Sequence, residues 1–367
     1  MPAANQPTVA LDLSVLENPH STGVERHARE LAIRLPARLM DCRVVALVRR
    51  PLPSIEGHGL DLIGASGFLP RAVWRRWSLP RMARDCGARV LHSFVTHVPA
   101  VAGLLVSRTV HDLPFTRPQE RGEPAQRWSD AAIRRQLRRA VPTVFVSEQS
   151  RRDALSLVAE TQLAPWAIVP GGVDDRFFQP APERCFDDLP EPFVLVVGMH
   201  RGRRRPGLVR RLARALATAR PGAGVVWVGA GAEGEAGEPA LVGLGYRTDD
   251  EVRALFDQAS LLLAPSTMEG FGIPVVEALA AGLSVLAADN PTTREVAGDH
   301  VRYFDVDDEE ALFTQAMCLL NEPVDESRRD AGCRHAGAFS WDHAADLLAA
   351  HLGTLLSRAT GAFDGRV

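Results

Sequence analysis

Two acidic residues in one short segment are the most informative chemical feature of this sequence. Glu269 and Glu277 are separated by seven residues within the segment 266–282, STMEGFGIPVVEALAAG. Free N–H groups at a helix start attract phosphate, and carboxylates accept hydrogen bonds from sugar or ribose hydroxyls. The combination therefore predicts a site for a sugar joined to a nucleotide diphosphate. The alternative interpretation is a helix-capping Glu277 beside a solvated Glu269.

The residues around these acids predict a strand, a glycine-rich loop and a helix that bring the two carboxylates together. The apolar run 261–265 is typical of a short buried strand, and the loop after it allows a ligand to approach the backbone closely. Pro274 suits the first position of the next helix, and Gly282 suits the left-handed stop after it. Glu277 is then expected in the first turn, with its side chain directed back toward the loop that carries Glu269.

This segment resembles the retaining glycosyltransferases of family 4, whose signature of two glutamates separated by seven residues matches Glu269 and Glu277. In its details the chain looks most like bacterial mannosyl- and rhamnosyltransferases that build O-antigens or exopolysaccharides. The resemblance continues into the flanking segments and into four short upstream landmarks. These are LVGLGYRTDDEVRALFDQASLLLAPS at 241–266, LSVLAADNPTTREVAGD at 283–299, TGVER at 22–26, VHDL at 110–113, VSEQSRRD at 146–153 and GGVD at 171–174.

The resemblance implies an α/β architecture of the GT-B type, with two Rossmann-like doubly wound parallel-sheet domains facing a central cleft. It implies retaining transfer of a hexose of the mannose, rhamnose or glucose type. The donor would be a GDP-, UDP- or dTDP-sugar, and the acceptor a glycan or lipid-linked saccharide. The family mechanism is a front-face displacement in which the departing phosphate takes the acceptor's proton. No metal or other cofactor is expected, because arginines and N–H groups would neutralise the leaving group.

The candidate site residues come from this resemblance and from residue chemistry. Arginines crowd the loop 201–205 after an apolar strand, and guanidinium groups bind phosphate bidentately. Where the family commonly has an Arg-Lys pair, this chain has Arg203-Arg204. The candidate catalytic residues are His111, Glu269, Arg203 and Arg204, and the candidate donor-binding residues are Gly23, Arg201, Gly245, Tyr246, Gly270, Phe271, Gly272, Ile273 and Glu277.

Each assignment outside the two-glutamate segment has a plainer alternative. The arginine loop could be a solvated basic surface that continues into the next helix, and Gly23 could simply follow an N-capping Ser or Thr. His111 is expected to donate a hydrogen bond to the sugar or phosphate, but it could instead satisfy a turn. Gly245 and Tyr246 could end a strand before the capping box Thr248 to Glu251. Two further histidines at strand ends, His92 and His97, are acceptor-side candidates only.

Alternating strand and helix patterns along the chain predict two parallel sheets. The second sheet opens with a strand at 193–197, followed by a helix whose apolar stripe is Leu208, Val209, Leu212, Ala213 and Leu216. Proline and glycine content places the linker at 171–192. The expected domains are an acceptor-binding domain at 1–175, a donor-binding domain at 176–345, and a final helix at 346–367 that crosses back to the first domain.

Composition limits the classes of function. The 367-residue chain has a formal charge of −3, which argues against nucleic-acid binding. All 42 basic residues are arginine, and five scattered cysteines fit reduced thiols in a cytoplasm. The absence of a leader or a long apolar run predicts a cytoplasmic protein, either soluble or peripheral on the inner face of the cell membrane. The mixed aromatic and basic segment 71–77 is the candidate for such a contact, and the alternative is a helix that packs its tryptophans inside the protein.

Other functions remain open at this stage. A nucleotide-sugar epimerase of the same fold would bind the same donor without an acceptor, and a catalytically silent binding partner would keep only the fold. A nicotinamide oxidoreductase is disfavoured, since neither opening strand precedes a G-x-G-x-x-G sequence. The acidic run 305–310 is better interpreted as charge at a helix start than as a set of metal ligands.

Overall fold

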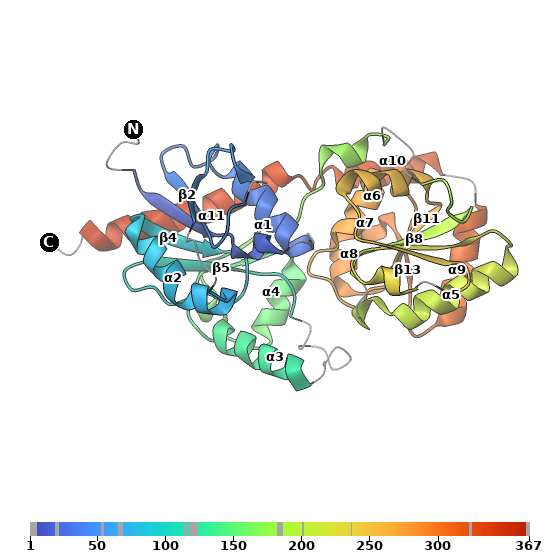
Figure 1. Cartoon of the computed structure of the whole chain (residues 1–367), viewed down its shortest axis with the longest axis horizontal. Coiled ribbons are helices and arrows are strands. Elements are labelled where there is room, and N and C mark those ends of the chain that lie inside the picture. Colours follow the sequence, from blue (N-terminus) through green and yellow to red (C-terminus); the bar gives the residue numbers. More distant parts are fainter. Residues whose placement is uncertain are drawn as a thin grey trace. The chain divides into compact units, whose positions relative to one another are not determined.

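The computed structural model describes residues 6–18, 22–52, 55–64, 69–113, 116, 124–181, 186–199, 202–235, 237–322 and 325–364. The chain forms two compact α/β units, drawn in Figure 1 in colours that follow the sequence. Unit 1 comprises Met1–Gly172 and Trp341–Val367, and unit 2 comprises Val173–Ser340. The chain therefore passes between units at 172/173 and 340/341, whereas the sequence pattern placed these boundaries at 175/176 and 345/346.

A seven-stranded parallel sheet lies at the centre of unit 1, in the order β3-β2-β1-β4-β5-β6-β7. The chain adds strands on one side of β1 and then on the other side, so the direction changes between β1 and β4. Such a switch point creates a crevice at the carboxyl ends of the strands. The strands are β1 (Thr8–Asp12), β2 (Arg43–Val48), β3 (Asp61–Gly64), β4 (Ala88–Ser93), β5 (Leu105–Val110), β6 (Thr143–Phe145) and β7 (Trp166–Ile168).

The long helix α11 (Trp341–Asp364) belongs to unit 1, although it follows unit 2 in the chain. It packs against α1, β4 and β7, and Arg38 donates hydrogen bonds to Asp342 and Asp346 at 2.7 and 2.6 Å. None of the helices in the described ranges is long and apolar enough to cross a bilayer. The other helices of unit 1 are α1 (Gly23–Arg34), α2 (Arg71–Asp85), α3 (Pro124–Leu137) and α4 (Glu148–Leu155).

A six-stranded parallel sheet forms the centre of unit 2, in the order β10-β9-β8-β11-β12-β13. Its switch point lies between β8 and β11. The strands are β8 (Phe193–Val197), β9 (Gly224–Val228), β10 (Leu241–Gly245), β11 (Leu261–Ala264), β12 (Val285–Ala288) and β13 (Arg302–Phe304). The helices are α5 (Pro206–Ala219), α6 (Asp249–Gln258), α7 (Ile273–Ala280), α8 (Pro291–Ala297), α9 (Glu309–Asn321) and α10 (Glu326–Ala336).

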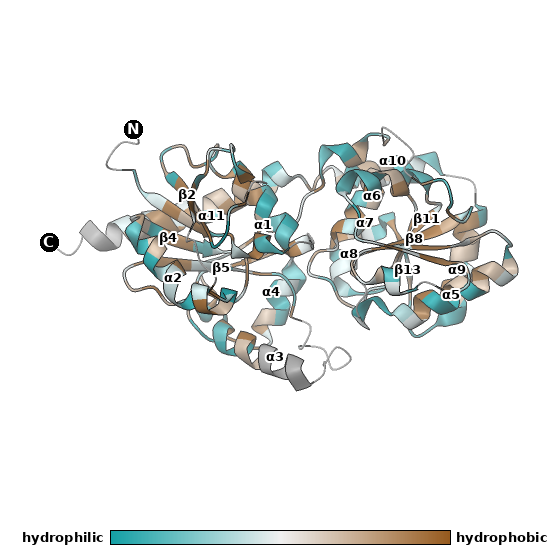
Figure 2. Cartoon of the chain, in the orientation of Figure 1, coloured by the Kyte–Doolittle hydropathy of each residue, from teal (hydrophilic) through white to brown (hydrophobic). Residues whose placement is uncertain are grey.

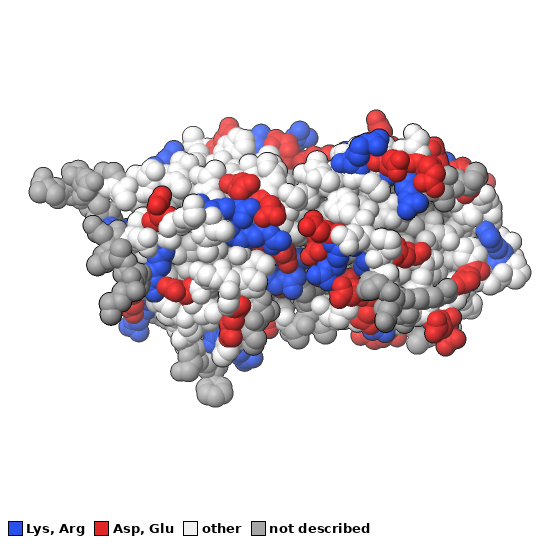
Figure 3. All heavy atoms as spheres, turned by 90° about the horizontal axis from the view of Figure 1, so that it is seen from above, with Lys and Arg blue, Asp and Glu red and all other residues white. Residues whose placement is uncertain are grey.

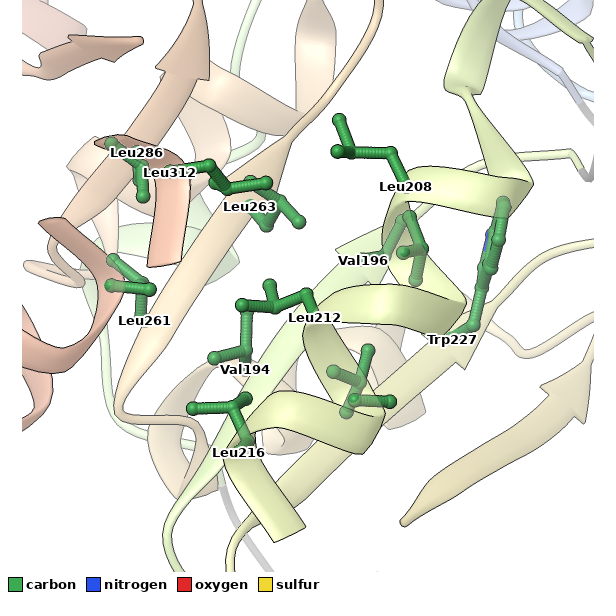
Figure 4. Close-up of a cluster of buried hydrophobic side chains, with 14 of the residues drawn as sticks. Val194, Val196, Leu208, Leu212, Leu216, Trp227, Leu261, Leu263, Leu286 and Leu312 are labelled. Carbon is green, nitrogen blue, oxygen red and sulfur yellow. The ribbon is translucent and has the colours of Figure 1, made fainter. Parts of the chain in front are cut away.

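The apolar stripe predicted for α5 is confirmed, because all of its members are buried. In Figure 4, Leu208, Leu212 and Leu216 of this helix face Val194 and Val196 on β8. Figure 2 shows the same arrangement more broadly, with hydrophobic residues along the strands of unit 2 and hydrophilic residues on the outer faces of its helices. This core holds the carboxyl ends of β8 and β11 in place.

The start of the predicted linker is part of unit 2. The short 3₁₀ segment Asp175–Phe178 packs against α7, and Phe177 is fully buried with its ring centroid 5.8 Å from that of Phe256. The linker prediction was wrong for these residues, because it relied on proline and glycine content and gave no weight to Phe177, which packs into the core.

Buried histidines connect α11 to the interior of unit 1. His92 lies between the hydroxyl oxygens of Ser107 and Thr109, each 3.1 Å from one of its ring nitrogens. The hydroxyl of Ser107 also lies 3.2 Å from Nε2 of His351 on α11. Burial lowers the pKa of His27 to about 3 and the pKa of His351 to about 4. These histidines are therefore neutral in the folded protein near neutral pH.

The free energy of unfolding is expected to fall as the pH drops below about 6.5. Between that value and the lowered pKa, the unfolded chain binds a proton at each histidine that the folded chain does not, so acid favours unfolding. Each histidine contributes up to about 1.4 kcal/mol per pH unit. Urea unfolding followed by tryptophan fluorescence measures this slope, since five of the six tryptophans belong to unit 1. His351→Gln should make the decline shallower, with the exposed His58→Gln as control. Equal slopes in all three proteins would contradict the assignment.

Candidate functional site

The loop between β11 and α7 carries Glu269, and a glycine forms the N-cap of the helix that follows. Gly272 is the N-cap of α7 and has a φ of +93°, in the left-handed region that favours glycine. Pro274 is the second residue of the helix and has no N–H, and the N–H of Val275 already donates to Gly272 O at 2.9 Å. The donors that this helix start can offer to a ligand are therefore the backbone N–H groups of Phe271 to Ile273.

Glu277 lies in the second turn of α7, not in the first turn as predicted. The helix begins at Ile273, which makes Glu277 its fifth residue, and the side chain is only 2% exposed. Pro274 is likewise the second residue of the helix and not the first. The predicted stop is confirmed, because Gly282 has a φ of +71° and the N–H of Leu283 donates to Ala278 O at 2.9 Å.

A pocket of about 310 Å³, open to solvent, lies at the switch point between β8 and β11. Its lining residues are Val197, Arg204, Leu262, Leu263, Ala264, Ser266, Glu269, Gly272, Pro274, Val275 and Thr293. The structure thus brings Glu269, Arg204 and Gly272 together around this pocket, and Glu277 is not among its lining residues.

Arg204 and Glu269 form the charged pair of this pocket. The Nη2 atom of Arg204 lies 3.3 Å from Oε1 of Glu269, and the two side chains are 13% and 15% exposed. Nη1 of Arg204 donates to Val197 O at 2.9 Å. The guanidinium lies directly over Gly198, where an added Cβ would be 2.3 Å from Cζ of Arg204. Gly198, which also has a φ of +125°, therefore makes room for the arginine.

The other arginines of this region have different surroundings. The carbonyl of Arg203 accepts a hydrogen bond from the N–H of Thr267 at 3.2 Å, which ties the arginine loop to the loop of Glu269. Arg205 is paired with Asp307 at 3.0 Å, and Arg201 lies outside the described residues. On α5 the arginines are half-exposed and each is paired with an acid, in the pairs Arg210–Glu235, Arg211–Glu309 and Arg214–Glu238, of which Glu235 is buried. The solvated-surface interpretation holds for α5, but Arg204 lines the pocket.

Residues from the start of α8 fix the loop of Glu269. The side chain of Asn290 donates to Ser266 O at 2.9 Å, and the hydroxyl of Thr292 donates to Glu269 O at 2.8 Å. The hydroxyl of Ser266 is buried in the pocket and has no hydrogen-bond partner among the described residues. Sequence reasoning missed Ser266 and Gly198, although each directly follows a predicted strand, at the end where ligands bind.

Gly245 and Tyr246 lie at the end of β10, outside this pocket. Gly245 has a φ of +69°, and its carbonyl accepts a hydrogen bond from the N–H of Gly229 at 2.7 Å. The ring of Tyr246 is 41% exposed. The capping box of Thr248 and Glu251 that follows is confirmed. Backbone geometry therefore accounts for Gly245, while Tyr246 presents an aromatic surface on which a base could stack.

The acidic run before α9 serves that helix and its neighbours. Asp308 caps α9 by accepting a hydrogen bond from Ala311 N–H at 2.9 Å, which confirms the helix-start interpretation.

Within the described ranges, no group of three or more His, Cys, Asp or Glu side chains is arranged to hold a metal ion. On the face drawn in Figure 3, basic and acidic side chains lie next to one another.

In unit 1, the helix start at Gly23 is already occupied by a capping box. Thr22 accepts a hydrogen bond from Val24 N–H at 3.4 Å, and the carboxylate of Glu25 accepts one from Thr22 N–H at 3.0 Å. Because the buried Glu25 supplies negative charge at this helix start, it opposes the binding of a second anion there. The capping interpretation accounts for this segment without a ligand.

His111 is held in one tautomer. Its Nε2 lies 3.0 Å from the carbonyl oxygen of Phe94, which can only accept, so Nε2 carries the proton and Nδ1 is an acceptor. Burial is the main reason that the pKa of His111 is lowered, and Glu25 and Asp112 act in the opposite direction. The neutral ring can thus accept a hydrogen bond from a sugar hydroxyl through Nδ1. The expected donation to the sugar would require the imidazolium, which burial disfavours.

The two acceptor-side candidates, His92 and His97, differ in their exposure to solvent. His92 belongs to β4, opposite Ser107 of β5, and is fully buried, so it faces the interior and not an acceptor. That prediction was wrong because the strand extends one residue past His92, to Ser93. His97 lies beyond the strand, on the exposed side of the loop.

Comparison with known proteins identifies both halves of the chain. The family model described as Glycosyl transferases group 1 matches residues 190–334, and the one described as Glycosyltransferase Family 4 matches residues 21–177. The O-antigen chain mannosyltransferase B of Escherichia coli is 32% identical over 104 residues, which are 27% of this chain. The match spans only 26% of that relative's own length.

Solved structures with the same architecture cover nearly the whole chain. Sucrose-phosphate synthase from Thermosynechococcus elongatus has a TM-score of 0.74 at 18% identity, covering 97% of this chain and 100% of that one. Anabaena HepE, solved in complex with UDP and glucose, has a TM-score of 0.69 at 15% identity and covers 95% and 100%. The two parallel-sheet units thus have the GT-B fold, as predicted. The two family models together match most of the chain, which belongs to the glycosyltransferases of family 4.

Proposed function

We propose that this protein transfers a hexosyl group from a nucleotide-diphosphate sugar to a saccharide acceptor, with retention of anomeric configuration. The observation that supports this most directly is the pair of Arg204 and Glu269 across the pocket of unit 2. The guanidinium offers charge to a diphosphate, and the carboxylate accepts hydrogen bonds from sugar hydroxyls. The pair lies at the switch point of a doubly wound sheet, where such folds bind nucleotides.

The donor proposal combines chemistry and similarity. Mannose is the sugar that the name of the E. coli relative suggests, and UDP is the nucleotide bound to the Anabaena neighbour. In the proposed site, Glu269 orients the sugar and Glu277 binds the ribose. The hydroxyl of Ser266, which has no partner within the described ranges, bonds a hydroxyl or phosphate oxygen. The nucleotide bases of GDP-, UDP- and dTDP-sugars are all candidates for stacking on the ring of Tyr246.

The proposed displacement occurs on one face of the sugar. The acceptor hydroxyl bonds to the anomeric carbon as the bond from that carbon to the diphosphate breaks, and its proton passes to the departing phosphate oxygen. Arg204, with Arg203 and the N–H groups of Phe271 to Ile273, stabilises the charge that develops on the diphosphate. His111 accepts a hydrogen bond from a sugar hydroxyl and keeps its own proton on Nε2.

The acceptor is proposed to be a glycan or a lipid-linked saccharide that binds unit 1. The switch point of that sheet, between β1 and β4, carries polar groups at the strand ends. Asp12 lies 2.7 Å from Nη2 of Arg75 and accepts a hydrogen bond from Ser93 at 2.9 Å. These side chains fix the crevice where the acceptor is expected.

A panel of GDP-, UDP- and dTDP-sugars, each with and without saccharide acceptors, tests the function. Nucleotide release that depends on acceptor, with a product of the donor's anomeric configuration by NMR, is the expected result. Release or sugar interconversion without any acceptor would instead indicate the epimerase alternative. A chain that binds nucleotide sugars but converts none of them would indicate a silent binding partner, and inversion of configuration would overturn the retaining mechanism.

Transfer is expected to continue in excess chelator with at most a modest loss of rate. The proposed leaving-group site uses fixed cationic and N–H donors, and these replace the role that a divalent ion has in other transferases. Activity assays with and without EDTA, followed by addition of magnesium or manganese, measure the effect. Loss of activity in EDTA with recovery in one specific ion would contradict metal independence.

We also propose peripheral contact with the inner face of the cell membrane through α2, for a protein located in the cytoplasm. Trp74 is buried, but Val73 and Trp77 are exposed at a spacing of four residues, at 39% and 65%. Exposed arginines share the helix, at Arg71, Arg76, Arg81 and Arg84. An exposed apolar and basic helix surface suits an anionic membrane.

The protein is expected to co-sediment with vesicles that contain phosphatidylglycerol. It is expected to stay in the supernatant with vesicles of phosphatidylcholine alone. Trp77→Ser should weaken the binding several-fold, since burying an aromatic side chain supplies much of the contact energy. Trp166→Ser is the matched control, because Trp166 is also exposed on unit 1, at 38%. Equal binding by the two variants would contradict a contact through α2.

A further inference from the structure

Phe339, in the last residues of unit 2, supports the loop that carries Glu269. Its ring centroid lies 5.4 Å from that of Phe271 at an angle of 72°, an edge-to-face contact. Phe271 is only 7% exposed and belongs to the segment Gly270 to Ile273 at the start of α7. On its other side, Phe339 meets the ring of His335 at 5.5 Å and 74°. The Phe339 ring is therefore fixed between α10 and the candidate donor loop.

The backbone of Phe339 is fixed as well, at the point where the chain enters and leaves unit 2. Its carbonyl accepts a hydrogen bond from Val173 N–H at 2.8 Å, and its own N–H donates to Ala336 O at 3.0 Å. Val173 and Ser340 form a parallel bridge, so the first and last residues of unit 2 lie side by side. One residue thus contacts both ends of the unit through its backbone and the donor loop through its side chain.

We propose that Phe339 is a positioning residue for donor binding, which acts through Phe271. The ring sets the position of Phe271 and so of the N–H groups that the proposed function assigns to the diphosphate. The inference rests on that function for its effect on catalysis. The physical link between Phe339 and the loop is independent of it.

Phe339→Leu removes the edge-to-face contact and keeps an apolar side chain. We expect the KM for the donor to rise by roughly two- to tenfold, in line with the loss of one aromatic pair, while the KM for the acceptor stays unchanged. Phe339→Tyr keeps the ring and should restore the donor KM. Phe313→Leu is the control, because Phe313 is a partly buried phenylalanine that packs on the core from α9.

Hydrogen exchange of the peptide that spans 266–280 gives a second readout that needs no activity. Exchange is expected to be faster in Phe339→Leu than in the wild type, and unchanged in Phe313→Leu. If Phe339→Leu fails to fold, Phe339→Met replaces it, since methionine fills irregular space. Wild-type donor KM and wild-type exchange in a folded variant would overturn the proposal. If the wild type transfers no sugar, the proposed function is wrong. Faster exchange in Phe339→Leu would still support the link from Phe339 to the loop.

Discussion

Replacing Arg204 with alanine is expected to lower kcat/KM for sugar transfer by about 10²- to 10³-fold, or about 2.7 to 4 kcal/mol, the range for removal of one donor to a developing negative charge. The guanidinium lies in the pocket beside Glu269, so the variant also leaves that carboxylate without its cationic partner. The loss should appear in kcat at saturating donor. Neither magnesium nor manganese should restore it. Steady-state kinetics with the best donor of the panel measure the effect.

Arg211→Ala is the matched control for this experiment. Arg211 is an arginine of the same unit and pairs with Glu309 at 2.5 Å on the surface, with both side chains about half exposed. Such a pair is worth little, so kinetics close to wild type are expected. A normal rate in Arg204→Ala would remove Arg204 from the catalytic assignment. The double change of Arg203 and Arg204 would then test whether Arg203 compensates.

Glu277→Gln is expected to weaken the binding of donor and of free nucleotide alike, by about 1.5 to 3 kcal/mol, the range for hydrogen bonds to a charged group. Glutamine keeps the shape of a side chain that is only 2% exposed, so the fold is affected less than by alanine. Isothermal titration calorimetry with the free nucleotide measures this directly, because no turnover is needed.

Glu235→Gln provides the comparison for Glu277. Glu235 is equally buried, at 2%, and is bonded to Arg210 on α5. Both variants are expected to lose stability, but only Glu277→Gln should lose nucleotide affinity. Equal nucleotide affinity in the wild type and Glu277→Gln would show that this carboxylate has a purely structural role in α7.

The strands and helices of unit 2 could be predicted from the sequence because their side-chain periodicity is strong. The bounds of β8 match the predicted 193–197, and the stripe on α5 is buried as expected. The start of α7 was predicted one residue too late. Gly272 takes a left-handed φ as the N-cap, and the helix begins at Ile273 and not at Pro274. Glu277 is therefore the fifth residue of the helix, in its second turn, and its side chain is buried.

The site itself depends on contacts between residues far apart in the chain, which spacing alone does not encode. The approach of Arg204 to Glu269 requires Gly198, whose missing side chain leaves room for the guanidinium. The tautomer of His111 depends on the carbonyl of Phe94. In both cases the sequence offered Arg204, Glu269 and His111 as candidates, while the contact partner or the direction of the hydrogen bond came from the folded chain.

The placement of α11 has a consequence for how this chain is made on the ribosome. Unit 2 occupies a continuous stretch, Val173–Ser340, while unit 1 needs both Met1–Gly172 and the helix that starts at Trp341. During synthesis, all of unit 2 emerges before the helix that carries His351 can dock beside Ser107. Unit 1 can therefore complete its core only after all of unit 2 has been synthesised, although unit 1 contains the N-terminal part of the chain.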